Sequence, residues 1–137
     1  MMPSMARVVT NALLYWAAIL ALGFVLGAVR LLVLVPHLGV AGAVAAELPA
    51  MLGASWLVAG ALLRRWPLPS HNAALAMGAL AFALLIASEI GLATQLFGAS
   101  LAGWAQGVAS PAGLLGLGGQ VLFGAIPGWR WRGGRQP

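Results

Sequence analysis

The segment from Val8 to Val29 is a run of about 22 residues without a charged side chain. As an α-helix it would be roughly 33 Å long, enough to cross the ~30 Å hydrocarbon core of a bilayer. It is too long for the apolar region of a signal peptide, and the chain beyond it is equally apolar. We therefore expect a retained transmembrane helix.

The composition of the whole chain agrees with a membrane setting. Of its 137 residues, 62% are hydrophobic and 7% are charged, whereas charged residues make up ~25% of a soluble globular domain. The net charge of +5 comes from arginines that stand at the ends of apolar segments. That placement is typical of membrane topology, so the lipid bilayer is the expected partner and nucleic acid is not. The sequence has no cysteine, which excludes disulfides and thiolate metal sites.

Turn signals divide the chain into four apolar helices. Residues 31–63 are too many for one helix, and the proline and glycine within residues 35–39 predict a turn there. Ser110 and Pro111 are typical of an N-cap and a first helical position, and residues 98–109 before them suit a loop or an interfacial turn. The sequence predicts one all-α domain over residues 1–137, an integral membrane bundle of four transmembrane helices at about 8–33, 40–63, 72–97 and 111–128, with a basic tail at 129–137.

The arginines are distributed unevenly between the two sides that four crossings would define. One side receives six of the seven, namely Arg7, Arg64, Arg65, Arg130, Arg132 and Arg135. The other side receives only Arg30. Because arginine favours the cytoplasmic side of a membrane, both termini are predicted to be cytoplasmic.

Three ionisable residues, Arg30, Glu47 and Glu89, fall inside the predicted helices. A charged side chain near the bilayer centre costs ~2.5–3.5 kcal/mol on insertion scales unless it is paired or hydrated. Counted from the outer helix ends at ~1.5 Å per residue, all three lie roughly 9–12 Å deep. The sequence therefore predicts one intramembrane polar cluster.

The cluster has two interpretations. In the first it is a site open to the periplasm, where Arg30 neutralises one glutamate and the other binds a proton, a cation or a polar substrate. One arginine against two glutamates then leaves either a bound cation or a protonated carboxyl group. In the second, Arg30 and Glu47 form a strut between two helices, and Glu89 is neutral or reaches toward the interface. A cavity that reaches the cluster would favour the first, and a dry, paired cluster the second.

Pro49 lies within a turn of Glu47. Proline removes the hydrogen bond to the carbonyl of Ala45 and is expected to kink the helix. The freed carbonyl, beside a carboxylate, could bind a cation. The alternative is a membrane proline whose freed carbonyl is satisfied by neighbouring groups.

Small residues recur at four-residue spacing in the first and last predicted helices. Gly23 and Gly27 form a GxxxG pair, and Gly116, Gln120 and Gly124 share one face of the last helix. Such spacing lets helix backbones approach closely in membranes. The glycine-rich face of the last helix is interpreted as packing within the chain, as a dimer seam, or as the wall of a pathway with Gln120 as its polar contact.

The first half of the chain carries a resemblance to a known family. The residues concerned are Gly23-Phe24-Val25-Leu26-Gly27 through Arg30, Pro36, Glu47-Leu48-Pro49 with Met51, Ser55-Trp56 and Arg64-Arg65. They resemble a family of small four-helix bacterial inner-membrane proteins that has no established activity. The resemblance implies a multi-pass protein of the bacterial inner (cytoplasmic) membrane and supplies no function.

The sequence contains no nucleophile with a neighbouring base, no convincing phosphate loop and no metal motif. His37 and His71 are predicted on opposite membrane faces, so they cannot share a metal or a haem. We therefore expect no catalytic residue, no cofactor and no metal. The predicted function is a small transporter or channel-like protein for a proton, a cation or a small solute, and a homo-oligomer is the expected assembly. The alternative is a non-catalytic accessory or assembly subunit that docks on a membrane complex through its glycine-rich last helix.

Overall fold

The structure, a computed structural model, describes residues 4–96 and 98–131. Of these residues, 92% are helical, which confirms the predicted all-α class. In chain order the elements are α1 (Ser4–Val29), the π-helical turn η1 (Arg30–Leu34), α2 (Val35–Arg65), α3 (His71–Gly91), the π-helical turn η2 (Leu92–Leu96), α4 (Leu101–Ala109) and α5 (Pro111–Arg130). Arg132 and Arg135 of the predicted basic tail lie outside the described residues.

Three helical stretches in the described chain are long and apolar enough to cross a membrane, namely residues 5–65, 71–96 and 111–130. Large apolar side chains cover their outer surfaces. Val25, Leu32 and Leu57, for example, are 62%, 78% and 69% exposed. Such a surface is unfavourable in water and suits hydrocarbon. The fold is therefore that expected of a membrane protein.

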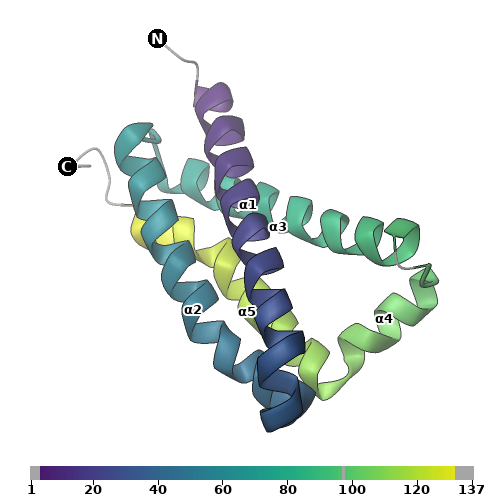
Figure 1. The fold of residues 1–137 in the computed structure, drawn as a ribbon. Coiled ribbons are helices and arrows are strands. Elements are labelled where there is room, and N and C mark those ends of the chain that lie inside the picture. Colours follow the sequence, from purple (N-terminus) through teal and green to yellow (C-terminus); the bar gives the residue numbers. More distant parts are fainter. Residues whose placement is uncertain (1–3, 97, 132–137) are drawn as a thin grey trace.

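The first of these stretches doubles back on itself at Gly39. Its backbone has φ +76° and ψ 173°, a conformation that glycine adopts readily and L side chains rarely adopt. Figure 1 shows the chain reversing direction in this region, so that α1 lies alongside the rest of α2. The sequence predicted a turn spread over residues 35–39. The structure instead keeps helical backbone up to Leu38 and confines the break to one residue.

The widened turn η1 lies immediately before Pro36. Within it, the N–H of Val35 donates to the carbonyl of Arg30, five residues earlier. Pro36 has no N–H to give to the carbonyl four residues before it. A π-helical turn is one way for a helix to absorb that loss without ending, which explains why helical backbone continues past Pro36 to Leu38.

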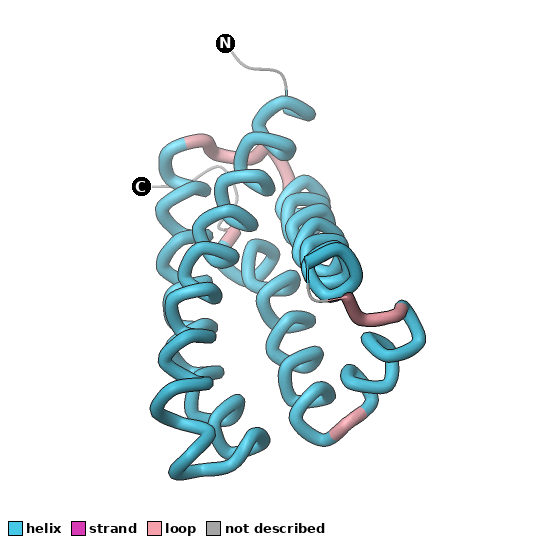
Figure 2. The backbone as a smooth tube through the Cα atoms, turned by 45° about the vertical axis from the view of Figure 1, so that its right-hand side comes forward, coloured by secondary structure: helices cyan, strands magenta, loops and turns pink. Residues whose placement is uncertain are grey.

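The helices do not form a parallel bundle. Figure 1 shows α3 running across the pair formed by α1 and α2, and in Figure 2 α3 is seen nearly end-on while α1 and α2 stand upright. α4 leads from the far end of α3 back to the start of α5, which packs against both α2 and α3. The buried core lies where α1, α2, α3 and α5 meet, and its largest fully buried apolar side chains are Tyr15, Leu63 and Met77.

The inner face of α1 follows helical periodicity. Its buried members are Val8, Ala12, Tyr15 and Ile19, which recur every three or four residues. That spacing places all four on one side of a helix. The alanine in this set, like Ala59 on α2, is fully buried, and a small side chain there lets the helices approach closely.

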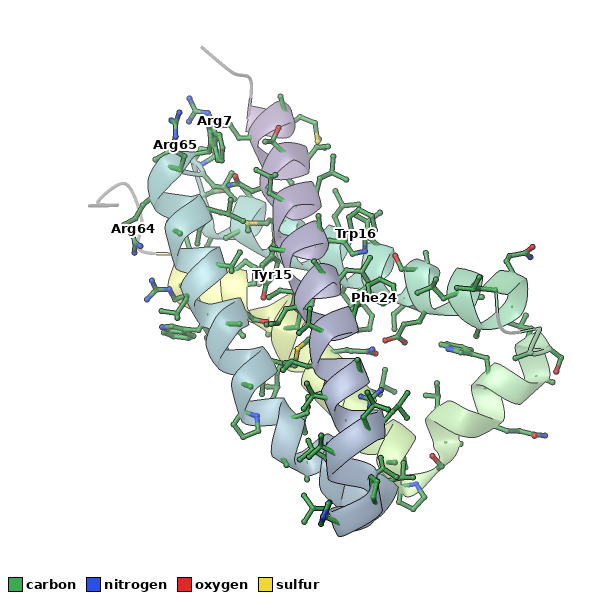
Figure 3. All side chains as sticks on the ribbon, in the orientation of Figure 1. Arg7, Tyr15, Trp16, Phe24, Arg64 and Arg65 are labelled. Atoms are coloured by element: carbon green, nitrogen blue, oxygen red, sulfur yellow. The ribbon has the colours of Figure 1, made fainter. Side chains whose placement is uncertain are left out.

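The connection between α2 and α3 is held by residues from both ends of the chain. Three side chains donate hydrogen bonds to its carbonyl groups, each at 3.0 Å: Arg7 to Pro67, Asn11 to Trp66, and Trp131 to Leu68. Figure 3 shows Arg7, Arg64 and Arg65 gathered at this end of the molecule. The two ends of the described chain and the connection therefore share one side, hereafter the arginine-rich end.

Residues 101–109 form a helix, α4, where the sequence predicted a loop or an interfacial turn. The Ser100 hydroxyl accepts a hydrogen bond from the N–H of Gly103 at 2.9 Å and so caps the helix. At ~1.5 Å per residue, α4 is about 13 Å long and too short to cross a bilayer. Ser110 caps α5 in the same way, with Pro111 at the first helical position, as predicted.

Candidate functional site: a polar cavity

A cavity of about 320 Å³ lies among α1, α2, α3 and α5. Arg30, Glu47, Glu89 and Gln120 all line it, although the helices that carry them are otherwise apolar. The rest of the wall is mainly leucine, glycine and phenylalanine. The three ionisable residues singled out in the sequence thus lie around one cavity, and the glutamine of α5 lies with them.

Arg30 and Glu47 form an ion pair across the hairpin that residues 5–65 make by reversing at Gly39. Nη1 of Arg30 lies 2.8 Å from Oε2 of Glu47, and the two side chains are 32% and 10% exposed. A side chain on a helix points back toward the N-terminus, and the Arg30 guanidinium accordingly lies near Gly27. The pair neutralises both charges and links η1 to α2. Both interpretations of the cluster include such a pair.

Glu89 is held by an amide instead. Nε2 of Gln120 on α5 donates a hydrogen bond to Oε1 of Glu89 on α3. Among the described residues, Glu89 has no arginine partner. An amide donor stabilises a carboxylate without cancelling its charge. Glu89 therefore supplies a carboxyl group to the cavity that no positive side chain balances.

The position of Glu89 relative to α1 is fixed by the residue before it. Nε1 of Trp16 donates a hydrogen bond to the Ser88 hydroxyl at 2.9 Å, and that hydroxyl donates to the carbonyl of Leu84 at 2.7 Å. Figure 3 shows Trp16 on the side of α1 that faces α3. This contact joins α1 to α3, so that Glu89 is placed at the cavity from a helix that crosses the hairpin.

Tyr15 on α1 and Phe123 on α5 are held together beside the cavity. The Tyr15 hydroxyl donates to the carbonyl of Phe123 at 2.6 Å, and the two rings stack with their centroids 4.2 Å apart. Tyr15 is fully buried, and Phe123 also lines the cavity. Sequence analysis did not single out Tyr15 as a site residue. Its spacing from Ala12 and Ile19 could have indicated it, because that spacing puts a polar hydroxyl on the buried face of α1.

Some glycines of the predicted packing faces lie in helix contacts and others border open space, and their four-residue spacing does not distinguish the two. Gly124 packs against α3, where a Cβ would lie 3.2 Å from the Cβ of Phe82. Gly23 is in ordinary contact distance of Met51 on α2, whereas Gly116 has open space beside it and lines the cavity. The closest approach to backbone involves a glycine that the sequence did not indicate: a Cβ on Gly78 of α3 would collide with the backbone carbonyl of Gly124.

Pro49 lies inside α2 and keeps helical backbone angles, because Gly39 is the residue of α2 with non-helical angles. Neither Pro49 nor Ala45, whose carbonyl Pro49 frees, is among the residues that line the cavity, whereas Glu47 and Leu48 are. The predicted cation-binding carbonyl therefore gains no support from the cavity wall.

The described fold and site define a class: an all-α protein whose described residues include three helical stretches long and apolar enough to span a membrane, with a cavity that holds an ion pair and one further carboxyl group. Compared with protein families, curated proteins and solved structures, the chain matches none. The resemblance of residues 23–65 to a bacterial inner-membrane family stays a prediction.

Proposed function

We propose that this chain is a multi-pass membrane protein that binds a small cation in its polar cavity and passes it across the bilayer. The observation that carries the proposal is the cavity reaching Glu89, which has no arginine partner among the described residues. An ionisable group among membrane helices is costly to keep unless it is used.

The two interpretations of the polar cluster apply to different members of it. A strut accounts for Arg30 and Glu47, which neutralise each other. It does not account for Glu89, because a hydrogen bond between α3 and α5 needs no ionisable group, and a second amide opposite Gln120 would serve equally well. Binding of a positive solute is the role that requires a carboxyl group at this position.

We propose four crossings with both termini in the cytoplasm, in which α3 crosses the bilayer steeply tilted from α1 and α2 because it runs across that pair. The reversal at Gly39 leaves residues 40–65 as an arm of about 39 Å at ~1.5 Å per residue, long enough to cross alone. The α1 arm is longer still. Arg7, Arg64 and Arg65 at one end of the molecule favour the cytoplasm for that end. The bacterial inner membrane, implied by the resemblance, is part of the same proposal.

Reporter fusions in a bacterial host test the topology. Alkaline phosphatase, active only outside the cytoplasm, is expected to be active when inserted at Gly39 and inactive when inserted between Trp66 and Ser70. Green fluorescent protein is expected to give the opposite pattern at the same two sites, because arginine-rich connections stay inside. Equal reporter activity at the two sites would show that residues 5–65 do not cross twice.

The alternative, an accessory subunit that docks through the glycine-rich face of its last helix, loses its main support. On that face, Gly124 packs against Phe82 of α3, and Gly116 and Gln120 line the cavity. Packing within the chain therefore uses much of the face that was expected to meet a partner. Homo-oligomer formation is still compatible with the exposed apolar surface.

The experiment for the transport proposal is an electrical one on reconstituted protein. Proteoliposomes on a solid-supported membrane are exposed to steps of K⁺, Na⁺, ammonium and benzyltrimethylammonium, and the displacement current is recorded. Wild-type protein is expected to give a current with at least one of these cations. Glu89→Gln keeps the side-chain shape but removes the charge, and should reduce that current at least about tenfold, since a charge-assisted contact is worth ~1.5–3 kcal/mol.

Gln106→Ala is the matched control, because Gln106 lies on the exposed helix α4 and does not line the cavity. It should leave the current unchanged. A full-size current from correctly folded Glu89→Gln protein, or no current from the wild type with any of the four cations, would contradict the proposal.

A further inference from the structure

We infer that the cation is an amphipathic organic ammonium ion, with one positive charge and an apolar body. This inference rests on the proposed function and names the substrate class of the same cavity. Its basis is the combination of one unbalanced carboxyl group with a largely apolar wall.

The charge of the site sets the charge of the ligand. Arg30 and Glu47 cancel at 2.8 Å, so Glu89 is the group that a positive ligand would balance. The hydrogen bond from Gln120 occupies Oε1 of Glu89 and leaves Oε2 available as an acceptor. One carboxylate in a site of low dielectric favours a monovalent cation, because a second positive charge would stay uncompensated.

The donor set does not suit a bare metal ion. Calcium takes 6–8 oxygen ligands, and magnesium takes six at near-octahedral geometry. Among the described residues, the oxygen-bearing side chains that line the cavity are Glu47, Ser55, Glu89 and Gln120. Glu47 is already paired with Arg30, and the remaining side-chain oxygens are fewer than either ion needs. The described residues contain no group of three or more His, Cys, Asp or Glu side chains that could hold a metal. An organic cation carries its own covalent substituents and needs fewer oxygen contacts.

The wall supplies what an apolar body requires. The cavity volume of about 320 Å³ is at the lower end of the ~300–1,000 Å³ range of small-molecule sites and far exceeds what a proton needs. The apolar side chains lining it include Ile19, Leu20, Phe24, Leu85, Leu92 and Phe123. Phe24 and Phe123 add aromatic faces, which attract ammonium groups within ~6 Å. A hydrated inorganic ion would gain nothing from these contacts.

Binding measurements on the purified full chain in lipid nanodiscs test the inference with three probes. Benzyltrimethylammonium has both the charge and the apolar body, tetramethylammonium keeps the charge, and benzyl alcohol keeps the ring without the charge. By isothermal titration calorimetry, benzyltrimethylammonium is expected to bind at least about tenfold more tightly than either of the others.

Two substitutions separate the contribution of the Glu89 charge to binding from that of the Phe24 ring. Glu89→Gln should weaken benzyltrimethylammonium binding about tenfold and leave benzyl alcohol binding unchanged. Phe24→Ala should weaken binding of both ammonium probes, and that of benzyltrimethylammonium more, because both lose a cation–π contact and benzyltrimethylammonium also loses a contact with its ring. The wild-type comparison of the three probes needs no variant, so the test holds even if a variant folds poorly.

The outcomes separate this inference from the transport proposal. Equal binding of tetramethylammonium and benzyltrimethylammonium, or tighter binding of benzyl alcohol, would overturn the inference even if inorganic cations give a Glu89-dependent current. Glu89-dependent binding of benzyltrimethylammonium without any current would uphold the substrate class and refute transport.

Discussion

Gly78→Ala is expected to lower the melting temperature of the detergent-solubilised protein by roughly 5 °C or more, because the added methyl group would collide with the backbone carbonyl of Gly124. The obstacle is backbone, so it cannot move aside as the end of a side chain can. α3 and α5 would have to separate, and both helices contribute to the buried core through Met77 and Phe123. Overpacking of this kind typically costs ~1–3 kcal/mol.

The control substitution is Gly91→Ala in the same helix. No atom lies within 4 Å of the position that its Cβ would take. Because alanine favours helix over glycine by ~1 kcal/mol, this variant should melt at the wild-type temperature or above it. Thermal unfolding monitored by circular dichroism, with size-exclusion profiles of heated samples, measures both. Equal melting temperatures for the two variants would show that the α3–α5 crossing is looser than the structure indicates.

Arg30→Gln is expected to destabilise the protein strongly, and a second substitution, Glu47→Gln, is expected to restore most of the loss. The single change leaves the Glu47 side chain, 10% exposed, without its partner. Breaking a buried ion pair on one side typically costs ~3–5 kcal/mol. Arg30 is 32% exposed, so we expect the lower end of that range. In the double variant two amides face each other and no charge is left uncompensated.

The same pair of variants tests the division of roles within the cavity. If Arg30 and Glu47 act as a strut, the double variant should recover both its melting temperature and the Glu89-dependent current. Stability is measured by thermal unfolding and current on the solid-supported membrane. A double variant that regains stability but conducts no current would place Arg30 or Glu47 in solute binding. One less stable than Arg30→Gln would contradict the strut itself.

The membrane class and the gathering of charged residues could be predicted because both follow from solvation. A chain this apolar must lie in hydrocarbon, and the ionisable groups inside it gain most by sharing one place. Arg30, Glu47 and Glu89 do line the same cavity. Local capping chemistry was equally accessible, and Ser110 caps α5 as its position before Pro111 predicts.

The pairing within the cluster could not be derived from depth alone. Depth counts assume straight helices that run parallel, whereas α3 runs across the hairpin and two π-helical turns alter the register near Arg30 and after Glu89. These features decide that Glu47 meets the arginine and Glu89 meets Gln120. They depend on contacts between helices, which local sequence preference does not specify.

Glycine spacing shows the same limit. The sequence indicates that one face of α5 is small, but not which neighbour each residue meets. Gly124 meets α3, while Gly116 on the same face borders open space. Gly78, the glycine that approaches another helix's backbone most tightly, belongs to no four-residue series of glycines in α3. Its role follows from the crossing of two helices, and only their relative placement reveals it.

The reversal at Gly39 also affects the order in which the chain can assemble. Loop closure costs less conformational entropy the shorter the loop, and here a single residue separates two helical arms. The two arms can therefore pair as soon as both have left the ribosome, before the remaining helices exist. α5 follows these helices along the chain and must fit against α2 and α3 already in place. The cavity beside Glu89 is complete only when α5 has packed there.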